Sequence, residues 1–284
     1  MATRNNKDRT GAPGAGVTDD TATSAPNLLD FVVPTEFVEL PSGGEFYPKD
    51  HSLHGQSSIE IRYMTAKDED TLTSKTLLKQ GVALERVLQN LLVDKSVNIN
   101  DLLVGDKNAI VVAARSSAYG PDYETKVTCP ACGTVDEKTF DLSEIGFIEQ
   151  ADLGDLGITK NDDMTFSILL PVTKVEATVR LMTGQDENKL STLRGNKKKL
   201  SKDAEFSMTD QFKQFVVSIS GVEDRNQISS FINNMPANDS RFLRLAYKKI
   251  VPNIDLQQHF ECNSCEFEQD MEVPFTTDFF WPKL

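Results

Sequence analysis

Four cysteines are the residues of this sequence whose type and spacing could support chemistry. They occur as two C-x-x-C pairs, Cys129 with Cys132 in VTCPACG, and Cys262 with Cys265 in HFECNSCEF. A C-x-x-C pair on a tight turn directs two thiolates at one cation, and two such turns complete a tetrahedral four-thiolate zinc site. We therefore predict one structural Zn²⁺ ion held by all four cysteines, with no ligand position left open for a catalytic water.

Two other interpretations of the cysteines are reduced thiols without a metal and a thiol oxidoreductase. Redox activity of this kind requires a thiolate activated at the start of a helix. The segments that follow the two pairs, CGTVDEKTFDL and CEFEQDMEVPF, favour strands instead. The N-terminus lacks the pattern of a secretory signal, so we expect the chain to stay in the reducing cytoplasm, where structural disulfides are disfavoured.

The composition narrows the functional classes further. The 284 residues carry a formal net charge of −13, which repels nucleic-acid phosphates, and no apolar run is long enough to cross a bilayer. A zinc-ribbon nucleic-acid-binding module would need a basic face, yet the residues flanking the cysteine pairs are acidic: Glu124, Asp136, Glu137, Glu261, Glu266 and Glu268. Three histidines and no nucleotide-binding or nucleophile motif leave little material for catalysis, so we expect no enzymatic activity.

The elements between the cysteine pairs must bring them together across the chain. Residues 1–33 are rich in Gly, Ala, Thr, Asp and Pro and predict a disordered tail. A strand is expected over Ile59–Thr65, followed by a helix that Thr65 and Asp68 cap. Another helix is expected to follow Asp106 and to end near Gly120. The clearest helix carries apolar residues at the spacing of one buried face: Leu84, Val87, Leu88, Leu91 and Leu92.

A repeated order of motifs predicts two related halves. ATVRLMTGQDENKLST, from Ala177 to Thr192, matches IEIRYMTAKDEDTLTS, from Ile59 to Ser74, at six positions. Cys129 follows Asp106 by 23 residues, and Cys262 follows Asp239 by the same 23. We therefore predict an α+β fold of two tandem halves, 34–147 and 148–284, each with one cysteine knuckle, joined by a shared zinc ribbon.

Segments outside this repeat give further predictions. The basic stretch RGNKKKLSKDAEF, residues 194–206, lengthens the second half and is expected to form a loop. Two aromatic groups are candidate partner contacts, Phe46 with Tyr47 after a glycine pair, and Phe279, Phe280 and Trp281 near the C-terminus. The alternative for both groups is packing in the chain's own core, which we favour for the C-terminal group.

A set of motifs in fixed order is similar to a known family. LPSGGEFYP, DEDTLTS, LLVGDKNAIVVAARSSAYGPDYETKVTCPACG, VRLMTGQDE and the C-terminal CNSCEF and FFWP resemble a baseplate-protein family of T-even-type contractile-tailed bacteriophages. The family comprises baseplate hub subunits and hub assembly factors, and the resemblance runs from about Phe37 to Leu284.

This resemblance implies a non-enzymatic protein of tail morphogenesis that acts through protein contacts. Its implied partners are other phage baseplate and tail hub proteins, with self-association as a further interaction. Its implied location is the host cytoplasm during assembly and, for a hub subunit, the tail baseplate of the virion.

Overall fold

The computed structural model describes residues 33–149, 153–200, 208–274 and 277–280. The chain divides into two units, Met1–Val33 and Pro34–Leu284, and all the helices and strands described below belong to the second. The predicted tail therefore lies, except for Val33, outside the described residues. Within those residues no helix is both long enough and apolar enough to span a membrane.

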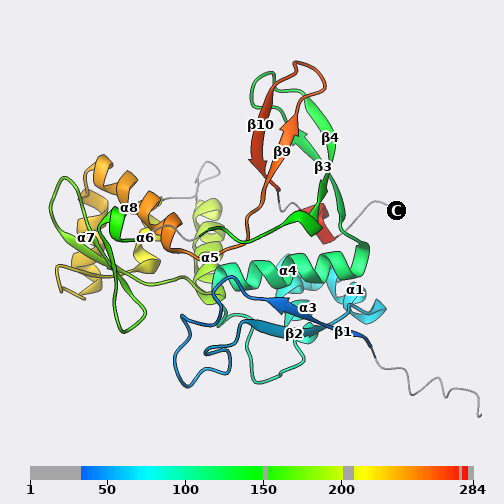
Figure 1. The fold of residues 1–284 in the computed structure, drawn as a ribbon, viewed down its shortest axis with the longest axis horizontal. Helices are drawn as coiled ribbons and strands as arrows, with labels where there is room; N and C mark the ends of the chain where they lie inside the picture. Colours follow the sequence, from blue (N-terminus) through cyan, green and yellow to red (C-terminus); the bar gives the residue numbers. More distant parts are fainter. Residues whose placement is uncertain (1–32, 150–152, 201–207, 275–276, 281–284) are drawn as a thin grey trace, which may run out of the picture. The chain divides into compact units, whose positions relative to one another are not determined.

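The described chain contains both helices and strands, which follow one another in short groups (Figure 1). Up to residue 147 the elements are β1 (Thr35–Glu39), β2 (Ser58–Arg62), α1 (Ala66–Thr73), α2 (Lys75–Gln80), α3 (Ala83–Leu91), α4 (Val104–Tyr119), β3 (Asp122–Thr128), β4 (Val135–Asp141) and the 3-10 helix η2 (Leu142–Glu144).

After residue 147 they are η3 (Gly154–Leu156), β5 (Ile158–Lys160), β6 (Phe166–Leu169), β7 (Glu176–Val179), α5 (Gly184–Leu200), α6 (Met208–Phe215), β8 (Val216–Ile219), α7 (Arg225–Asn234), α8 (Ala237–Ile250), β9 (Gln257–Glu261), β10 (Glu268–Glu272) and η4 (Thr277–Phe280). The predicted mixture of helices and strands is confirmed.

The strands form small antiparallel sheets. Strand β1 pairs with β2, β3 with β4, and β9 with β10, while β5, β6, β7 and β8 form a four-stranded sheet in that order. The β1–β2 and β6–β7 pairs have the same register relative to Arg62 and Arg180, the arginines that match in the repeated sequence. Phe37 lies opposite Glu60, two residues before Arg62, and Ser167 lies opposite Thr178, two residues before Arg180.

The core contains the apolar helix face that the spacing predicts. Val87, Leu88, Leu91 and Leu92 are fully buried, and Leu84 packs against them while remaining partly exposed. Helix α4 also forms where predicted and ends before Gly120, but it is buried on most of its surface rather than along one stripe. A helix buried all round lies at the centre of a domain, so α4 is the element on which neighbouring elements pack.

The basic segment after Leu193 corrects one prediction. Helix α5 runs from Gly184 to Leu200, so the expected loop over 194–206 is wrong for its first seven residues, and residues 201–206 lie outside the described chain. Lys, Leu and Arg are good helix formers, and one interior glycine, Gly195, costs a helix only about 1 kcal/mol. The helix begun at Gly184 can therefore continue through this segment.

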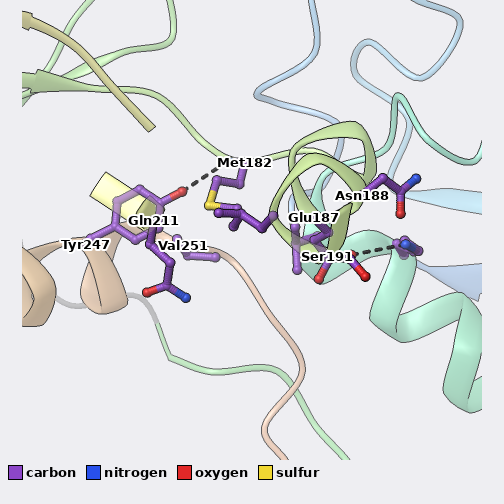
Figure 2. Close-up of a pocket in the computed structure, with 10 residues that line it drawn as sticks. Met182, Glu187, Asn188, Ser191, Gln211, Tyr247 and Val251 are labelled. Atoms are coloured by element: carbon purple, nitrogen blue, oxygen red, sulfur yellow. Dashed lines mark hydrogen bonds and ion pairs between the residues drawn. The ribbon is translucent and has the colours of Figure 1, made fainter. Parts of the chain in front are cut away.

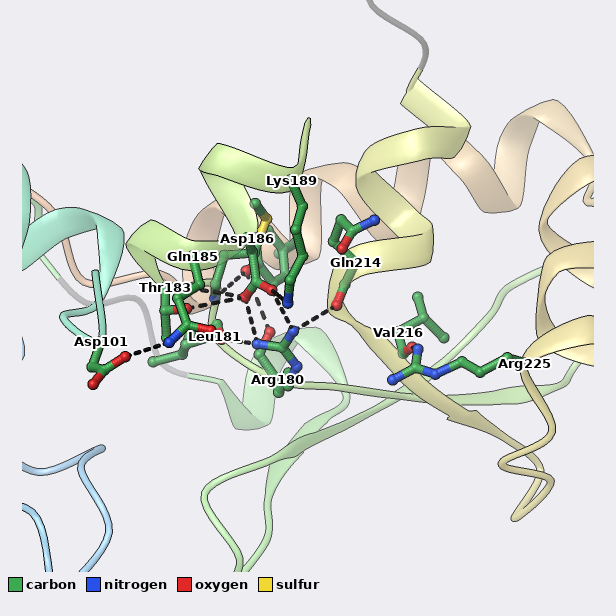
Figure 3. A network of polar contacts seen from close by, with 12 residues as sticks. Asp101, Arg180, Leu181, Thr183, Gln185, Asp186, Lys189, Gln214, Val216 and Arg225 are labelled. Carbon is green, nitrogen blue, oxygen red and sulfur yellow. Dashed lines mark hydrogen bonds and ion pairs between the residues drawn. The ribbon is translucent and has the colours of Figure 1, made fainter. Parts of the chain in front are cut away.

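The same ion pair forms at the start of α1 and of α5. Arg62 donates to both carboxylate oxygens of Asp68 at 2.7 and 2.9 Å, and Thr65 completes a capping box with this aspartate. Arg180 donates to both oxygens of Asp186 at 2.7 and 2.9 Å, and the backbone N–H of Thr183 donates to the same carboxylate (Figure 3). Burial raises the pKa of both aspartates, but the hydrogen bonds from the arginine and the threonine, together with the arginine charge, outweigh it and hold each pKa below its usual value.

A second pair of aspartates is buried at the start of α4 and of α8. Asp106 accepts hydrogen bonds from the Ser42 backbone N–H at 3.0 Å, the Ser42 hydroxyl at 2.6 Å and the Tyr47 hydroxyl at 2.6 Å. Asp239 accepts from the backbone N–H groups of Val172 at 2.7 Å and Thr173 at 3.0 Å. Each carboxylate thereby ties its helix to the turn that follows a strand. For α4 this strand is β1, and for α8 it is β6.

Candidate metal centre

The first cysteine pair lies in the turn between β3 and β4. The backbone N–H of Cys129 donates to the carbonyl of Thr134 at 2.8 Å, and that of Gly133 donates to the carbonyl of Cys129 at 2.9 Å. Gly133 has φ +74°, in the left-handed region that favours glycine. These bonds close the turn so that both thiols project from the same tip of the hairpin.

The second pair lies in the turn between β9 and β10 with the same backbone bonds. The N–H of Cys262 donates to the carbonyl of Phe267 at 2.9 Å, and that of Glu266 donates to the carbonyl of Cys262 at 3.1 Å. Glu266 has φ +54°, so here a side chain with a Cβ occupies the left-handed position that glycine fills in the first turn. The N–H of Ser264 also donates to the Cys262 sulfur at 3.4 Å.

The two turns meet and bring the four sulfurs together. The Sγ atoms of Cys129 and Cys265 are 3.8 Å apart, those of Cys132 and Cys262 are 3.7 Å apart, and all four lie within 4.8 Å of one another. A tetrahedral zinc ion with Zn–S bonds of about 2.3 Å requires S–S distances of about 3.8 Å. A disulfide needs about 2.05 Å, so all four are free thiols spaced for a metal. The predicted gathering of both pairs at one site is confirmed.

Burial and electrostatics also fit a metal centre. Cys129 and Cys262 are each 1% exposed, while Cys132 and Cys265 lie on the surface. Hydrogen bonds from the Thr134 hydroxyl and backbone lower the pKa of Cys132 to about 6. At Cys265 the Phe267 backbone lowers the pKa, but the neighbouring sulfurs, Cys132 first, outweigh it and raise the pKa to about 12. Thiolates this close repel one another, and a divalent cation that removes this repulsion would allow all four to ionise.

Contacts between the hairpins support the arrangement beyond the sulfurs. Lys138 on β4 donates to the Asn263 side chain at 3.2 Å, and the Asp136 carboxylate accepts from the Asn263 backbone N–H at 3.3 Å. Near the hairpin bases, Gln258 donates to the Asp141 carbonyl at 2.6 Å and accepts from the Asp141 N–H at 3.2 Å. The hairpins are thus joined at their bases as well as at their tips (Figure 1).

A buried arginine anchors the first hairpin to α4, and sequence reasoning did not find it. Arg115 is 2% exposed and donates to the carbonyls of Phe279 at 2.7 Å, Gly120 at 2.8 Å and Asp122 at 3.1 Å. Burial lowers the pKa of this guanidinium. The helix, β3 and the C-terminal η4 therefore meet on one side chain. Only its position in a run of apolar residues, AIVVAARSSAY, hinted at burial.

The surroundings of the cysteines bear on the thiol-oxidoreductase and the nucleic-acid-binding interpretations. Strands β4 and β10 follow the pairs, so neither pair sits at a helix N-terminus of the kind that activates a redox thiolate. Glu261 and Glu268 are exposed and lie directly opposite each other in the β9–β10 ladder. This hairpin carries no lysine or arginine, so its face opposes binding of a phosphate backbone.

The predicted aromatic contact residues lie mostly inside the chain. Tyr47 is 2% exposed and its hydroxyl accepts from the Leu103 N–H at 3.0 Å, while Phe46 is partly buried with its ring centroid 5.8 Å from that of Phe166. Phe279 and Phe280 are 2% and 4% exposed, which agrees with the favoured core packing of the C-terminal group. Trp281 lies outside the described residues. A partner-contact role for these five residues stays a prediction.

One cavity away from the cysteines separates α4 from α5, α6 and α8. It has a volume of about 500 Å³ and is lined by Val104, Lys107, Met182, Glu187, Asn188, Leu190, Ser191, Gln211, Tyr247 and Val251 (Figure 2). Lys107 and Glu187 form an ion pair of 3.0 Å across one side, and the Tyr247 hydroxyl accepts from the Met182 N–H at 3.0 Å on another. Its charged groups are thus already paired within the chain.

Comparisons with known proteins relate the chain to one family. The family model described as T4 bacteriophage base plate protein matches residues 33–281. No curated protein and no solved structure matches the chain significantly. The matched span includes every described helix and strand and both cysteine pairs.

Proposed function

Because this chain belongs to the T4 bacteriophage base plate protein family, we propose that it is a hub subunit of the phage baseplate or a factor that assembles the hub. The match over residues 33–281 is the observation that carries this proposal. A structural role in the tail follows from the family, and the choice of the hub rests on the ordered motifs of the sequence. The protein acts through contacts with other phage baseplate and tail hub proteins and performs no catalysis.

A structural zinc ion completes this proposal. One Zn²⁺ held by Cys129, Cys132, Cys262 and Cys265 would join the β3–β4 and β9–β10 hairpins into a single zinc ribbon. The sulfur distances near 3.8 Å support this ligand set, and four protein ligands leave no position for a catalytic water. Such an ion would link two segments that are distant in the sequence and would thereby stabilise the folded chain.

We further propose that the chain consists of two related halves, 34–147 and 148–284. Three features support this division: the shared register of β1–β2 and β6–β7, the matching Arg–Asp caps at α1 and α5, and the paired knuckles after α4 and α8. Under this proposal each half contributes one hairpin to the zinc ribbon, so neither can complete the metal centre alone.

Mass spectrometry with copy counting on purified virions tests the proposed role. A fixed copy number in the particle is expected for a hub subunit, whereas an assembly factor is absent from virions while its deletion leaves unfinished baseplates. Electron microscopy of lysates from the deletion mutant distinguishes these cases. Normal, complete baseplates in the deletion mutant would contradict both versions.

A further inference from the structure

Strand β1 has an open edge in the part of the chain that the structure describes. Its sheet has two strands, and no other described strand and no isolated bridge pairs with the side of β1 that faces away from β2. At the two ends of the β1–β2 pair, the Tyr63 N–H donates to the Pro34 carbonyl and the Leu40 N–H donates to the Ser57 carbonyl. Hydrogen-bonded positions recur at every second residue, so the backbone N–H and C=O groups of the even-numbered residues of β1 face β2. The N–H and C=O groups of Thr35, Phe37 and Glu39 therefore point outward.

The side chains along this edge are exposed, and one is large and apolar. Thr35, Phe37 and Glu39 are all exposed, and Phe37 has 72% of its surface open, the largest value among the exposed large apolar residues of the described chain. Natural sheets protect an open edge with charged side chains, proline or a bulge, because unpaired backbone groups recruit another strand. Here Pro34 and Glu39 lie only at the two ends of the edge. An aromatic residue at the middle of the edge does the opposite.

The corresponding edge of the other sheet is occupied. Strand β6 has the register of β1, and its outer side pairs antiparallel with β5, Thr159 lying opposite Ser167. Ser167 is the residue of β6 that corresponds to Phe37 in register. The position of β6 that corresponds to Phe37 thus accepts an antiparallel neighbour on the side away from β7.

The sequence of β1 suits an antiparallel copy of itself. Centring the pair on Phe37 places the two phenylalanines opposite each other, Thr35 opposite Glu39, and Glu36 opposite Val38. All the outward-pointing groups then pair, since antiparallel hydrogen-bonded positions recur at every second residue. No glutamate faces a glutamate, and an aromatic cross-strand pair is favourable.

We propose that β1 pairs with β1 of a second copy of this chain, centred on Phe37, to form a continuous four-stranded sheet across a two-fold dimer. The contact is isologous and closes, so it yields a dimer rather than a filament. It goes beyond the role in the baseplate, and failure of this contact would leave that role standing.

Light scattering coupled to gel filtration of the full zinc-loaded chain tests the proposal. At micromolar concentration the expected mass is twice the 31.5 kDa of one chain. Phe37→Lys sets two ammonium groups opposite each other and should weaken dimerisation at least about tenfold. The matched control is Leu169→Lys, which changes a 55% exposed residue on the strand that β5 already covers, and should leave the mass unchanged.

Cysteine cross-linking then tests the register. Hydrogen-bonded antiparallel partners have Cα atoms about 5.5 Å apart, which suits a disulfide. Phe37→Cys should cross-link with itself, whereas Thr35→Cys and Glu39→Cys should cross-link only when mixed. A monomer of wild-type chain, equal loss of mass with Leu169→Lys, or capture of the Phe37→Cys thiol by an engineered cysteine among residues 1–32 of the same chain would each overturn the proposal.

Discussion

Two pairs of buried aspartates stand at the starts of helices on either side of residue 147. The surroundings of one pair match, and those of the other pair differ. At the starts of α1 and α5 the arrangement is the same. Arg62 donates to both carboxylate oxygens of Asp68 at 2.7 and 2.9 Å, and Arg180 donates to those of Asp186 at the same two distances. Helices α4 and α8 also each begin with a buried aspartate, but the donors to the two carboxylates differ. A buried aspartate at the start of each helix is therefore common to both places, whereas the groups that donate to it differ.

The varying part is the turn after the strand. The long segment between β1 and β2 supplies Ser42 and Tyr47, whose hydroxyls donate to Asp106. The short turn between β6 and β7 supplies only the backbone N–H groups of Val172 and Thr173 to Asp239. A buried carboxylate must be satisfied wherever the framework places it, but side-chain and backbone donors are interchangeable.

Breaking the proposed zinc site should have the largest effect, because its four cysteines come from two hairpins that are distant in the sequence. Cys262→Ser removes one proposed ligand from a buried position, so we expect loss of stoichiometric zinc and a loss of stability of several kcal/mol. Elemental analysis and denaturant unfolding measure both. Ser264→Ala, an exposed position in the same turn, is the control and should change neither. Equal stability of Cys262→Ser and wild type, or no zinc in the wild-type protein, would contradict the proposed structural zinc site.

Breaking the two Arg–Asp ion pairs tests whether their equal geometry corresponds to equal contributions to the free energy of unfolding. Asp68→Asn and Asp186→Asn each leave a half-buried arginine without its carboxylate, and each should cost about 2–3 kcal/mol in the free energy of unfolding. Asp70→Asn changes an exposed carboxylate on α1 and should cost less than about 0.5 kcal/mol. Costs for the two caps that differ by more than about 1 kcal/mol would show that only the geometry is shared.

Local patterns in the sequence predict several elements of the fold. Apolar spacing predicts α3, the pairing of Thr65 with Asp68 predicts the start of α1, and the C-x-x-C spacing predicts both knuckles. Each signal lies within a few residues, where backbone geometry fixes which side chains meet.

Contacts between distant segments could not be predicted in this way. The roles of Arg115 and Asp106 depend on partners up to 164 and 64 residues away, and no local pattern names such partners. The meeting of the cysteine pairs is the exception, because four thiols of one chemistry have few other partners. The helical continuation of α5 was not predicted because a charged helix and a charged loop can have the same amino-acid composition.

The pH dependence of stability should distinguish the two central-helix aspartates. Burial raises the pKa of Asp106 above its usual 3.8 despite its hydrogen bonds, whereas at Asp239 the Val172 and Thr173 donors outweigh burial and lower the pKa. The folded state holds the Asp106 proton longer than the unfolded chain, so its contribution falls as pH rises from 3.8 through the folded pKa. The contribution of Asp239 is complete above 3.8 and is lost as pH falls through its lowered pKa.

Unfolding of Asp106→Asn and Asp239→Asn between pH 3 and pH 7, each compared with wild type, measures these contributions. Raising the pH should shrink the stability difference between wild type and Asp106→Asn and enlarge that between wild type and Asp239→Asn. Because both variants keep all four cysteines, the pH dependence of metal binding cancels in the differences. Slopes of the same sign would mean that the two turns provide equivalent environments after all.

The smallest expected effect lies in the knuckles, where Gly133 and Glu266 occupy the same left-handed position. Gly133→Ala should cost about 1 kcal/mol, and because no atom lies within 4 Å of the added Cβ, the cost is purely conformational. Glu266→Gly removes the strain of a Cβ at φ +54° but adds freedom to the unfolded chain, so a net gain of only about 0.5 kcal/mol is expected. Denaturant midpoints of the zinc-loaded variants measure both. A loss of stability on Glu266→Gly would mean that this carboxylate stabilises its knuckle by more than the backbone strain costs, and the second turn would then differ from the first in energetics as well as in sequence.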